Sequence, residues 1–576
     1  MKKINKIIII FLCASGLLLS NACTKKYETL NTDPRLVTAD LVNVGYLLTN
    51  VEANGIVSAG SYGNGTYGAY CGMDVRSDDN PFTNAASPGE WDFQYTNQLN
   101  NLSNIIQLIE AKTNKADFVN HEAIARILKA WDVSLLTDTY GDVPYSESSL
   151  PIDKVILSPK YDTQQSIYID LFKELKEAAA QLDDSKDSYG AADLVYNGDT
   201  GKWRKLANSL RLRLALRVSY VDPALATAQM SDLSEADLLT TLDDDAFVKN
   251  NTDFPDHLNP RYYRIINYGT VQESVQAHKV LIDILRNDGI HEDPRIGIFA
   301  DTVTATFKGG TSLNGYPFPN IDYRGQPTLG NVTEEFKYPW GFNTVSQLSD
   351  LWRAPVVAPA IMKCSEVYFA LAEARLRGLL PSTGFNSDPN FYYQKGIDAG
   401  IEWAKWFYSL VAPQIPDLMK NYLHYEGHYG VIGAQWTDAD VQNYLSYKEI
   451  KDAKITAFKA TPIYTLTGSN DAKLEMIMNQ KLIALYPDEF QGWCEYRRTG
   501  YPAQGLSPDV NSELKGKVPR REKYPVSEQT TNSTNYNDAL TRIGVDSRLS
   551  KFWWDANPAS PHVTSYVYPT QPTAYQ

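Results

Sequence analysis

The chain of 576 residues is poor in cysteine and in positive charge, and both shortages restrict what it can be. It contains 5 cysteines and no C-x-x-C motif, so no disulfide framework is indicated. Its 54 lysines and arginines are outnumbered by 68 aspartates and glutamates, which gives a net charge of −14. Because nucleic-acid phosphates attract basic surfaces, this balance disfavours nucleic acid as a partner.

The chain also lacks an apolar run long enough to span a bilayer, which takes about 20 residues. Its longest run, residues 7–19, follows a lysine-rich start and has the length of the apolar region of a secretory signal. The Ala-Cys pair that ends at Cys23 resembles the lipobox of bacterial lipoproteins, in which the cysteine becomes the lipidated N-terminus. Leu19 stands four places before Cys23 instead of the usual three, so ordinary signal cleavage stays open. We expect residues 1–22 to be a lipoprotein signal peptide and Cys23 to be lipidated.

The rest of the chain is expected to form one domain behind a tether. Residues 23–36 are polar and contain the turn signal Asn-Thr-Asp-Pro, which predicts an N-terminal tether, and residues 37–576 are expected to be a single domain. Without the 22 signal residues and their three lysines, the net charge changes from −14 to −17. We expect Cys71, Cys364 and Cys494 to be buried as small hydrophobic side chains.

Apolar residues recur at helical spacing through much of the domain. They place one apolar stripe on each predicted helix. The clearest stripes are Ile124, Ile127, Leu128, Trp131 and Leu135; Ile167, Leu171, Leu175 and Ala178; Trp203, Leu206, Ala207, Leu210 and Leu214; and Leu474, Ile477, Met478, Leu482 and Leu485. Because such helices follow one another with short breaks, the pattern predicts a mainly α fold of stacked helix pairs.

Two regions lack this periodicity and are rich in Gly, Pro, Asn and Tyr. They are residues 58–88 and 253–354. Long irregular segments are uncommon in a compact domain unless they are functional. We therefore expect loop-rich insertions here, built on the helical scaffold.

No motif predicts a cofactor, a metal or a catalytic residue. Residues 63–68 match G-x-G-x-x-G, but no βαβ context surrounds them, so a flexible loop is the better interpretation. His424 and His428 have the spacing of helical zinc ligands, but Gly427 weakens the helix and no third ligand is evident. No G-x-S-x-G nucleophile motif was found. A pair of catalytic carboxylates among the 68 acidic residues is left open, so an exported glycoside hydrolase is an alternative.

Four arginines crowd one predicted helix: Arg204, Arg211, Arg213 and Arg217. Planar guanidinium groups bind carboxylates in pairs, so these residues either clamp an acidic ligand or join neighbouring helices. We favour the structural interpretation.

Several segments of the chain are distinctive when they are taken together. They are Gly141-Asp142-Val143-Pro144-Tyr145; Tyr196-Asn197-Gly198-Asp199 with Lys202-Trp203; Ser365-Glu366-Val367-Tyr368; Gln480-Lys481-Leu482; Trp493 with Glu495-Tyr496-Arg497-Arg498-Thr499-Gly500; and Arg520-Arg521 with Tyr524-Pro525. Together they resemble the SusD/RagB family of nutrient-binding outer-membrane lipoproteins, in its SusD-like, starch-binding-associated branch. Any one of these segments is modest evidence, but they follow the order of the family from about residue 30 to the C-terminus.

The resemblance implies a tetratricopeptide-like scaffold on which irregular loops and short β-hairpins form the ligand face. It implies a non-enzymatic protein, lipid-anchored at Cys23 in the outer membrane, that passes an oligosaccharide or a peptide to a SusC-like TonB-dependent transporter. Residues 24–28 are mainly basic, whereas surface-exposed lipoproteins of these bacteria often carry acidic residues there. Exposure on the cell exterior is still expected from the resemblance, but because of this difference the opposite orientation stays open. In the matched segments Trp131, Trp203, Trp493 and Arg497-Arg498 are expected to be core or scaffold.

Sugar binding needs flat aromatic rings for the C–H faces and polar side chains for the hydroxyl groups. Both loop regions supply such residues, whereas the matched segments do not contain them. We predict that ligand contacts come from Tyr62, Tyr67, Tyr70, Tyr316, Asn320, Asp322, Tyr323, Arg324, Tyr338 and Trp340. A peptide ligand, and an adhesive envelope protein without a small ligand, are the alternatives.

Overall fold

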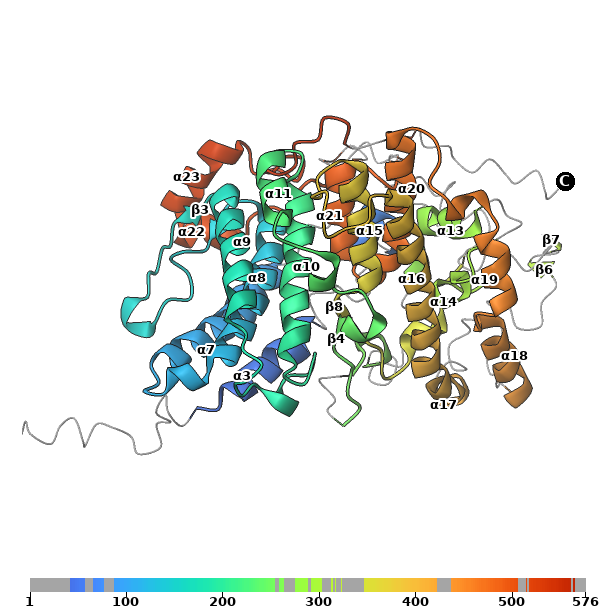
Figure 1. Ribbon diagram of the computed structural model, residues 1–576, viewed down its shortest axis with the longest axis horizontal. Helices are drawn as coiled ribbons and strands as arrows, with labels where there is room; N and C mark the ends of the chain where they lie inside the picture. The colour runs from blue at the N-terminus through green and yellow to red at the C-terminus, as the bar shows by residue number, and fades with distance from the viewer. Residues whose placement is uncertain are drawn as a thin grey trace, which may run out of the picture.

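The computed structural model of the protein consists mainly of helices, with short strands between them (Figure 1). The residues that the structure describes are 42–56, 66–76, 88–253, 258–263, 275–287, 292–302, 312–313, 316–317, 323, 346–421, 437–505, 514, 517–560 and 563–564.

The α-helices are α3 (Val44–Asn50), α5 (Thr66–Cys71), α6 (Pro88–Phe93), α7 (Asn100–Glu110), α8 (Val119–Tyr140), α9 (Gln164–Gln181), α10 (Thr200–Val218), α11 (Pro223–Met230), α13 (Lys279–Arg286), α14 (Ile296–Phe299), α15 (Cys364–Leu376), α16 (Pro389–Val411), α17 (Ile415–Asn421), α18 (Asp438–Lys448), α19 (Asp452–Lys459), α20 (Asn470–Leu485), α21 (Glu489–Thr499), α22 (Val526–Thr531) and α23 (Ser533–Ile543). The strands are β1 (Asp74–Arg76), β2 (Val143–Pro144), β3 (Tyr161–Asp162), β4 (Ala246–Phe247), β5 (Val275–Ala277), β6 (Ser312–Leu313), β7 (Tyr316–Pro317), β8 (Ala360–Met362), β9 (Gln504–Gly505) and β10 (Val563–Thr564).

Helices that follow one another in the chain pack against each other. Helix α8 packs on α9, α9 on α10, α15 on α16, and both α15 and α16 on α20. In Figure 1 the helices from α7 to α20 stand side by side across the molecule. The scaffold of stacked helix pairs is therefore confirmed, and the antiparallel pair β6–β7 is one of the short hairpins that were expected.

Helix α10 illustrates how the sequence sets these elements. It begins after Asp199, whose carboxylate accepts a hydrogen bond from the backbone N–H of Lys202 at 3.0 Å and so caps the helix. The predicted stripe from Trp203 to Leu214 is buried. The indole N–H of Trp203 donates to Asp193 at 2.7 Å, so the ring is buried without an unpaired donor.

The arginines of α10 join this helix to its neighbours. Arg213 donates to both oxygens of Glu366 on α15 at 2.7 and 2.6 Å, and both side chains are 3% exposed. Arg217 donates to Asp138 on α8 at 2.6 Å. The structural interpretation of this cluster is confirmed. The other pairs are Arg204 with Asp184 and Arg211 with Asp232.

Helix α21 is also part of the scaffold, as expected. Arg498 donates to both carboxylate oxygens of Glu373 on α15 at 2.5 and 2.6 Å. The guanidinium of Arg497 lies 3.5 Å from the centroid of the Trp493 ring. Gly500 ends the helix in the left-handed conformation, with φ +83°, which favours glycine. Cys71, Cys364 and Cys494 are buried and form no disulfide, as predicted.

Candidate functional site

Two of the predicted ligand residues, Tyr67 and Tyr70, lie in the hydrophobic core. They lie on helix α5, which packs against α21. The ring of Tyr67 stacks on Trp493, with centroids 5.1 Å apart, and its hydroxyl donates to Glu90 at 2.8 Å. Tyr70 is fully buried, and its hydroxyl donates to Glu522 at 3.3 Å. Neither ring presents a face to a ligand here, because the spacing of three residues puts both on the inner side of a helix where the sequence had indicated a loop.

Tyr323 is buried as well, with 3% of the residue exposed. Its ring stacks near Tyr447 of α18, with centroids 6.3 Å apart, and the two hydroxyl groups are hydrogen-bonded. Its carbonyl oxygen accepts a hydrogen bond from Arg286 of α13 at 3.3 Å. This tyrosine therefore packs within the protein.

The other predicted ligand residues are not placed. Tyr316 begins strand β7, but its side chain is not described. The predicted residues outside the described part are Tyr62, Asn320, Asp322, Arg324, Tyr338 and Trp340. Cys23 and the pair His424 and His428 lie outside it too.

A short sheet joins the two regions in which the ligand loops were predicted. Strand β1, from the first region, pairs with β5, from the second, in an antiparallel register that sets Val75 opposite Gln276. Gln276 also forms a bridge with Gln347, near the end of the second region. Strands β1 and β5, about 200 residues apart in sequence, therefore lie side by side.

Buried charges fix the base of this sheet. Glu489 of α21 accepts a hydrogen bond from the backbone N–H of Gly68 at 2.8 Å, and Arg261 lies 3.6 Å from Asp74 of β1. Burial, and then the nearby Asp74 carboxylate, raise the pKa of Glu489 well above its usual value. A Cβ atom on Gly68 would lie 1.9 Å from Asp74, so only glycine fits there. The sheet of β1 and β5, which joins the two predicted loop regions, is thus closely packed at the end where Asp74 lies.

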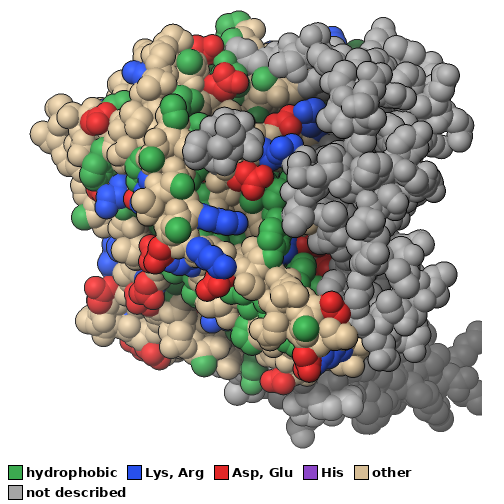
Figure 2. All heavy atoms as spheres, turned by 90° about the vertical axis from the view of Figure 1, so that its right-hand side faces the viewer, with side chains coloured by type: hydrophobic (Ala, Val, Ile, Leu, Met, Phe, Trp, Pro, Cys, Tyr) green, Lys and Arg blue, Asp and Glu red, His purple; other side chains and the backbone are tan. Residues whose placement is uncertain are grey.

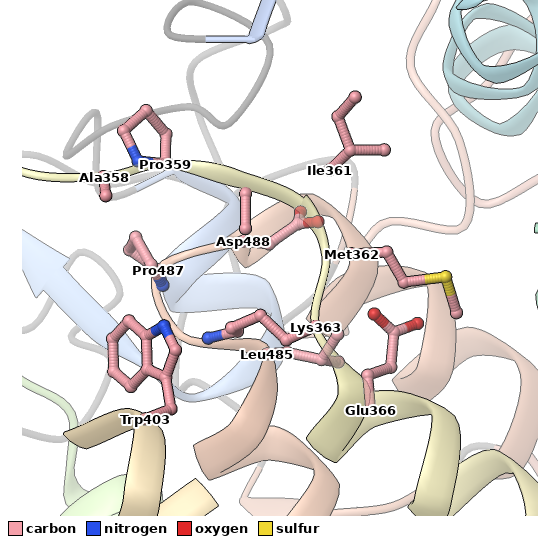
Figure 3. Close-up of a pocket in the computed structure, with 11 residues that line it drawn as sticks. Ala358, Pro359, Ile361, Met362, Lys363, Glu366, Trp403, Leu485, Pro487 and Asp488 are labelled. Carbon is pink, nitrogen blue, oxygen red and sulfur yellow. The ribbon is translucent and has the colours of Figure 1, made fainter. Parts of the chain in front are cut away.

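A separate buried cluster surrounds Lys363, before helix α15 (Figure 3). Its ammonium donates to the Tyr486 carbonyl at 2.7 Å and lies 4.0 Å from the centroid of the Trp403 ring. Burial lowers the pKa of Lys363 to about 8 and raises the pKa of Asp245 to about 7. These groups could exchange protons, but Lys363 is 4% and Asp245 3% exposed, which leaves a substrate no access. We assign this cluster a structural role.

The described residues contain no group of three or more His, Cys, Asp or Glu side chains that could hold a metal ion. Within that same part of the chain, no helix has both the length and the apolarity needed to cross a membrane. Figure 2 shows basic and acidic side chains interspersed over the described part of one face.

The comparisons with known proteins agree with this architecture. A family model described as "Starch-binding associating with outer membrane", SusD-like, matches residues 78–525. The chain belongs to the SusD-like family. None of the curated proteins matches it.

Solved structures of SusD-like proteins share the fold over nearly the whole chain. A chitin-binding protein is 28% identical with a TM-score of 0.67, and the match covers 89% of this chain and 100% of that one. A SusD homologue from Bacteroides uniformis is 25% identical with a TM-score of 0.64, covering 89% and 99%. A chitin-binding SusD homologue from Flavobacterium johnsoniae, 22% identical with a TM-score of 0.62 and covering 89% and 98%, supports the fold. The family and the fold class that the sequence predicted are both confirmed.

Proposed function

We propose that this SusD-like protein captures a glycan at the cell surface and delivers it to a SusC-like TonB-dependent transporter. Family membership supports this proposal, since the family model is described as starch-binding and two of the similar structures are named as chitin-binding. Those ligands belong to the related proteins, and for this chain we propose only the class, an oligosaccharide.

The observation that carries the proposal for the site is the pairing of β1 with β5. It joins the two aromatic-rich regions in one short sheet, which supports the proposal that side chains from both regions bind the same ligand. Tyr67, Tyr70 and Tyr323 are left out of the proposed site because they are buried. The proposed ligand residues are Tyr62, Tyr316, Asn320, Asp322, Arg324, Tyr338 and Trp340.

The proposed location follows from the N-terminal segment and from the family. The family is described as associating with the outer membrane, and the lipobox-like segment offers Cys23 as the lipid anchor. We propose that the domain faces the cell exterior on this anchor, where it meets both the nutrient and the transporter.

We propose binding without catalysis, and a titration can test both parts. Isothermal titration against matched panels of neutral oligosaccharides and peptides should show heat for at least one oligosaccharide and none for the peptides. Incubation with the bound sugar should release no reducing ends. Binding to a peptide alone would refute the glycan ligand, and turnover abolished by one carboxylate substitution would establish a hydrolase instead.

A further inference from the structure

A groove on the helical scaffold is lined by residues from outside both predicted loop regions. It lies between α7, α8, α9 and the segment 145–150, on the side of the molecule where Figure 1 shows these helices. Its volume is about 470 Å³, within the range of about 300–1,000 Å³ that small-molecule sites occupy. Hydroxyl, amide, ammonium and carboxylate groups all line it.

Lys129 brings an ammonium group into this groove and has no ion-pair partner among the residues that the structure describes. Helix α8 is almost entirely buried along its length, and Lys129 is one of its few partly exposed side chains. Its ammonium lies 6.0 Å from the centroid of the Tyr145 ring, and no carboxylate among the described residues lies within 4.0 Å of it. Burial lowers the pKa of Lys129, and the carboxylates of Glu174 and Asp170 offset part of this shift. A ligand oxygen at this ammonium would supply the acceptor that the protein does not.

Two serines of the groove are also unusual. Ser103 of α7 is 4% exposed, and its hydroxyl has no hydrogen-bond partner in the described structure, which is rare for a buried polar group. Ser149 has a φ of +50°, a strained conformation for a residue with a side chain. The side-chain amide of Gln107 donates to the Ser149 carbonyl at 2.9 Å and holds this segment in place.

The groove offers acceptors as well as donors. Asp170 accepts a hydrogen bond from the Tyr145 hydroxyl at 2.6 Å, which leaves its second oxygen for a ligand. Asp162 accepts from the backbone N–H of Ser146 at 2.7 Å. Two carboxylates against one ammonium make the groove net negative, so an anionic ligand would be repelled. A neutral molecule with many hydroxyl groups satisfies both kinds of lining group.

A second hollow, of about 520 Å³, adjoins the groove at the segment 148–150. Its lining includes Trp91 and Tyr95, of which Trp91 is buried and Tyr95 is partly exposed. A polar groove next to the ring of Tyr95 suits a sugar chain, which has a hydroxyl rim and C–H faces.

We propose that the groove at Lys129 is a second binding site, for a neutral sugar residue of an oligosaccharide. The Lys129 ammonium donates to a sugar oxygen, and Asp170 accepts from a sugar hydroxyl. This site goes beyond the proposed function, because it lies on the scaffold and does not involve the loop residues proposed above.

The test uses hydrogen–deuterium exchange of the full-length protein carrying Tyr316→Ala and Trp340→Ala, which removes the proposed loop site. The probes are maltotriose, cellotriose and triacetylchitotriose at millimolar concentration, with trigalacturonate as the anionic control. At least one neutral probe should slow exchange in residues 100–110 and 145–150, and trigalacturonate should not. Lys129→Met should weaken this protection by about tenfold in apparent affinity.

Lys173→Met on α9 is the matched control, since that lysine is 59% exposed, and it should change nothing. Lys129→Met should not lower the urea midpoint, because it breaks no ion pair among the described residues, so lost protection would report the lost donor. No protection by any neutral probe, equal protection in Lys129→Met, or equal protection by trigalacturonate would each overturn the proposal. If the proposed loop site is wrong, the result is different: the protein carrying Tyr316→Ala and Trp340→Ala should bind the oligosaccharide as tightly as the wild-type protein does.

Discussion

The buried pair of Arg213 and Glu366 gives the sharpest test of how the scaffold is held together. Its two hydrogen bonds join α10 to α15, and a third, from Arg213 to the Ile361 carbonyl at 2.8 Å, reaches strand β8. Substitution Arg213→Met keeps an unbranched stem that fills part of the space but leaves the Glu366 carboxylate buried without its partner. We expect this variant to lose about 3–5 kcal/mol of unfolding free energy.

The assay is urea unfolding followed by tryptophan fluorescence, with two comparison variants. Arg213→Met combined with Glu366→Leu removes both charges and should recover most of the loss. Arg204→Met is the matched control on the same helix, because its partner Asp184 is 71% exposed, and it should cost at most about 1 kcal/mol. If Arg213→Met costs no more than Arg204→Met yet abolishes ligand binding, the arginines clamp a ligand and our interpretation of the cluster fails.

Three further predictions concern the pH dependence, the core and the anchor. Burial raises the pKa of Glu90 to about 7 from a usual 4.5, so the folded state holds a proton that the unfolded state releases. Stability from this group should therefore fall by up to about 3 kcal/mol as pH rises from 4.5 through 7, and urea midpoints of Glu90→Gln should lack this slope. Tyr67→Ala should cost about 3–5 kcal/mol because it empties the site beside Trp493, whereas Tyr67→Phe should leave glycan affinity unchanged in a titration; weaker binding by Tyr67→Phe would return this residue to the ligand site. Cys23→Ser should move the protein from the membrane fraction to the soluble fraction on immunoblots, and an unchanged membrane fraction would contradict lipidation.

The periodic part of the fold could be predicted because its pattern is local. In α10 the apolar stripe lies within one run of sequence and is buried, as its spacing predicts. The sequence predicted that the arginines of α10 join neighbouring helices. It did not identify their partners, because Glu366 lies 153 residues from Arg213.

The burial of Tyr67, Tyr70 and Tyr323 could not be predicted from the sequence, because residues far away in the chain decide which aromatic side chains are buried. Helix α5 has six residues, too few to show a helical period, and Glu489, which binds its backbone, lies 421 residues away in sequence. Tyr323 is covered by Tyr447, 124 residues away. Strands β1 and β5 have three residues each, too few for an alternating pattern to reveal their pairing. The groove at Lys129 gave no signal either, because its polar residues match no motif.

The central claim is that side chains from the two loop regions form one site that captures a glycan. It is tested most directly by isothermal titration of wild-type protein, Tyr62→Ala and Trp340→Ala with the oligosaccharide that the panel identifies. Loss of one stacking ring should weaken binding by about tenfold, and the two single variants, one from each region, should leave the urea midpoint unchanged. Wild-type affinity in both variants would contradict the claim.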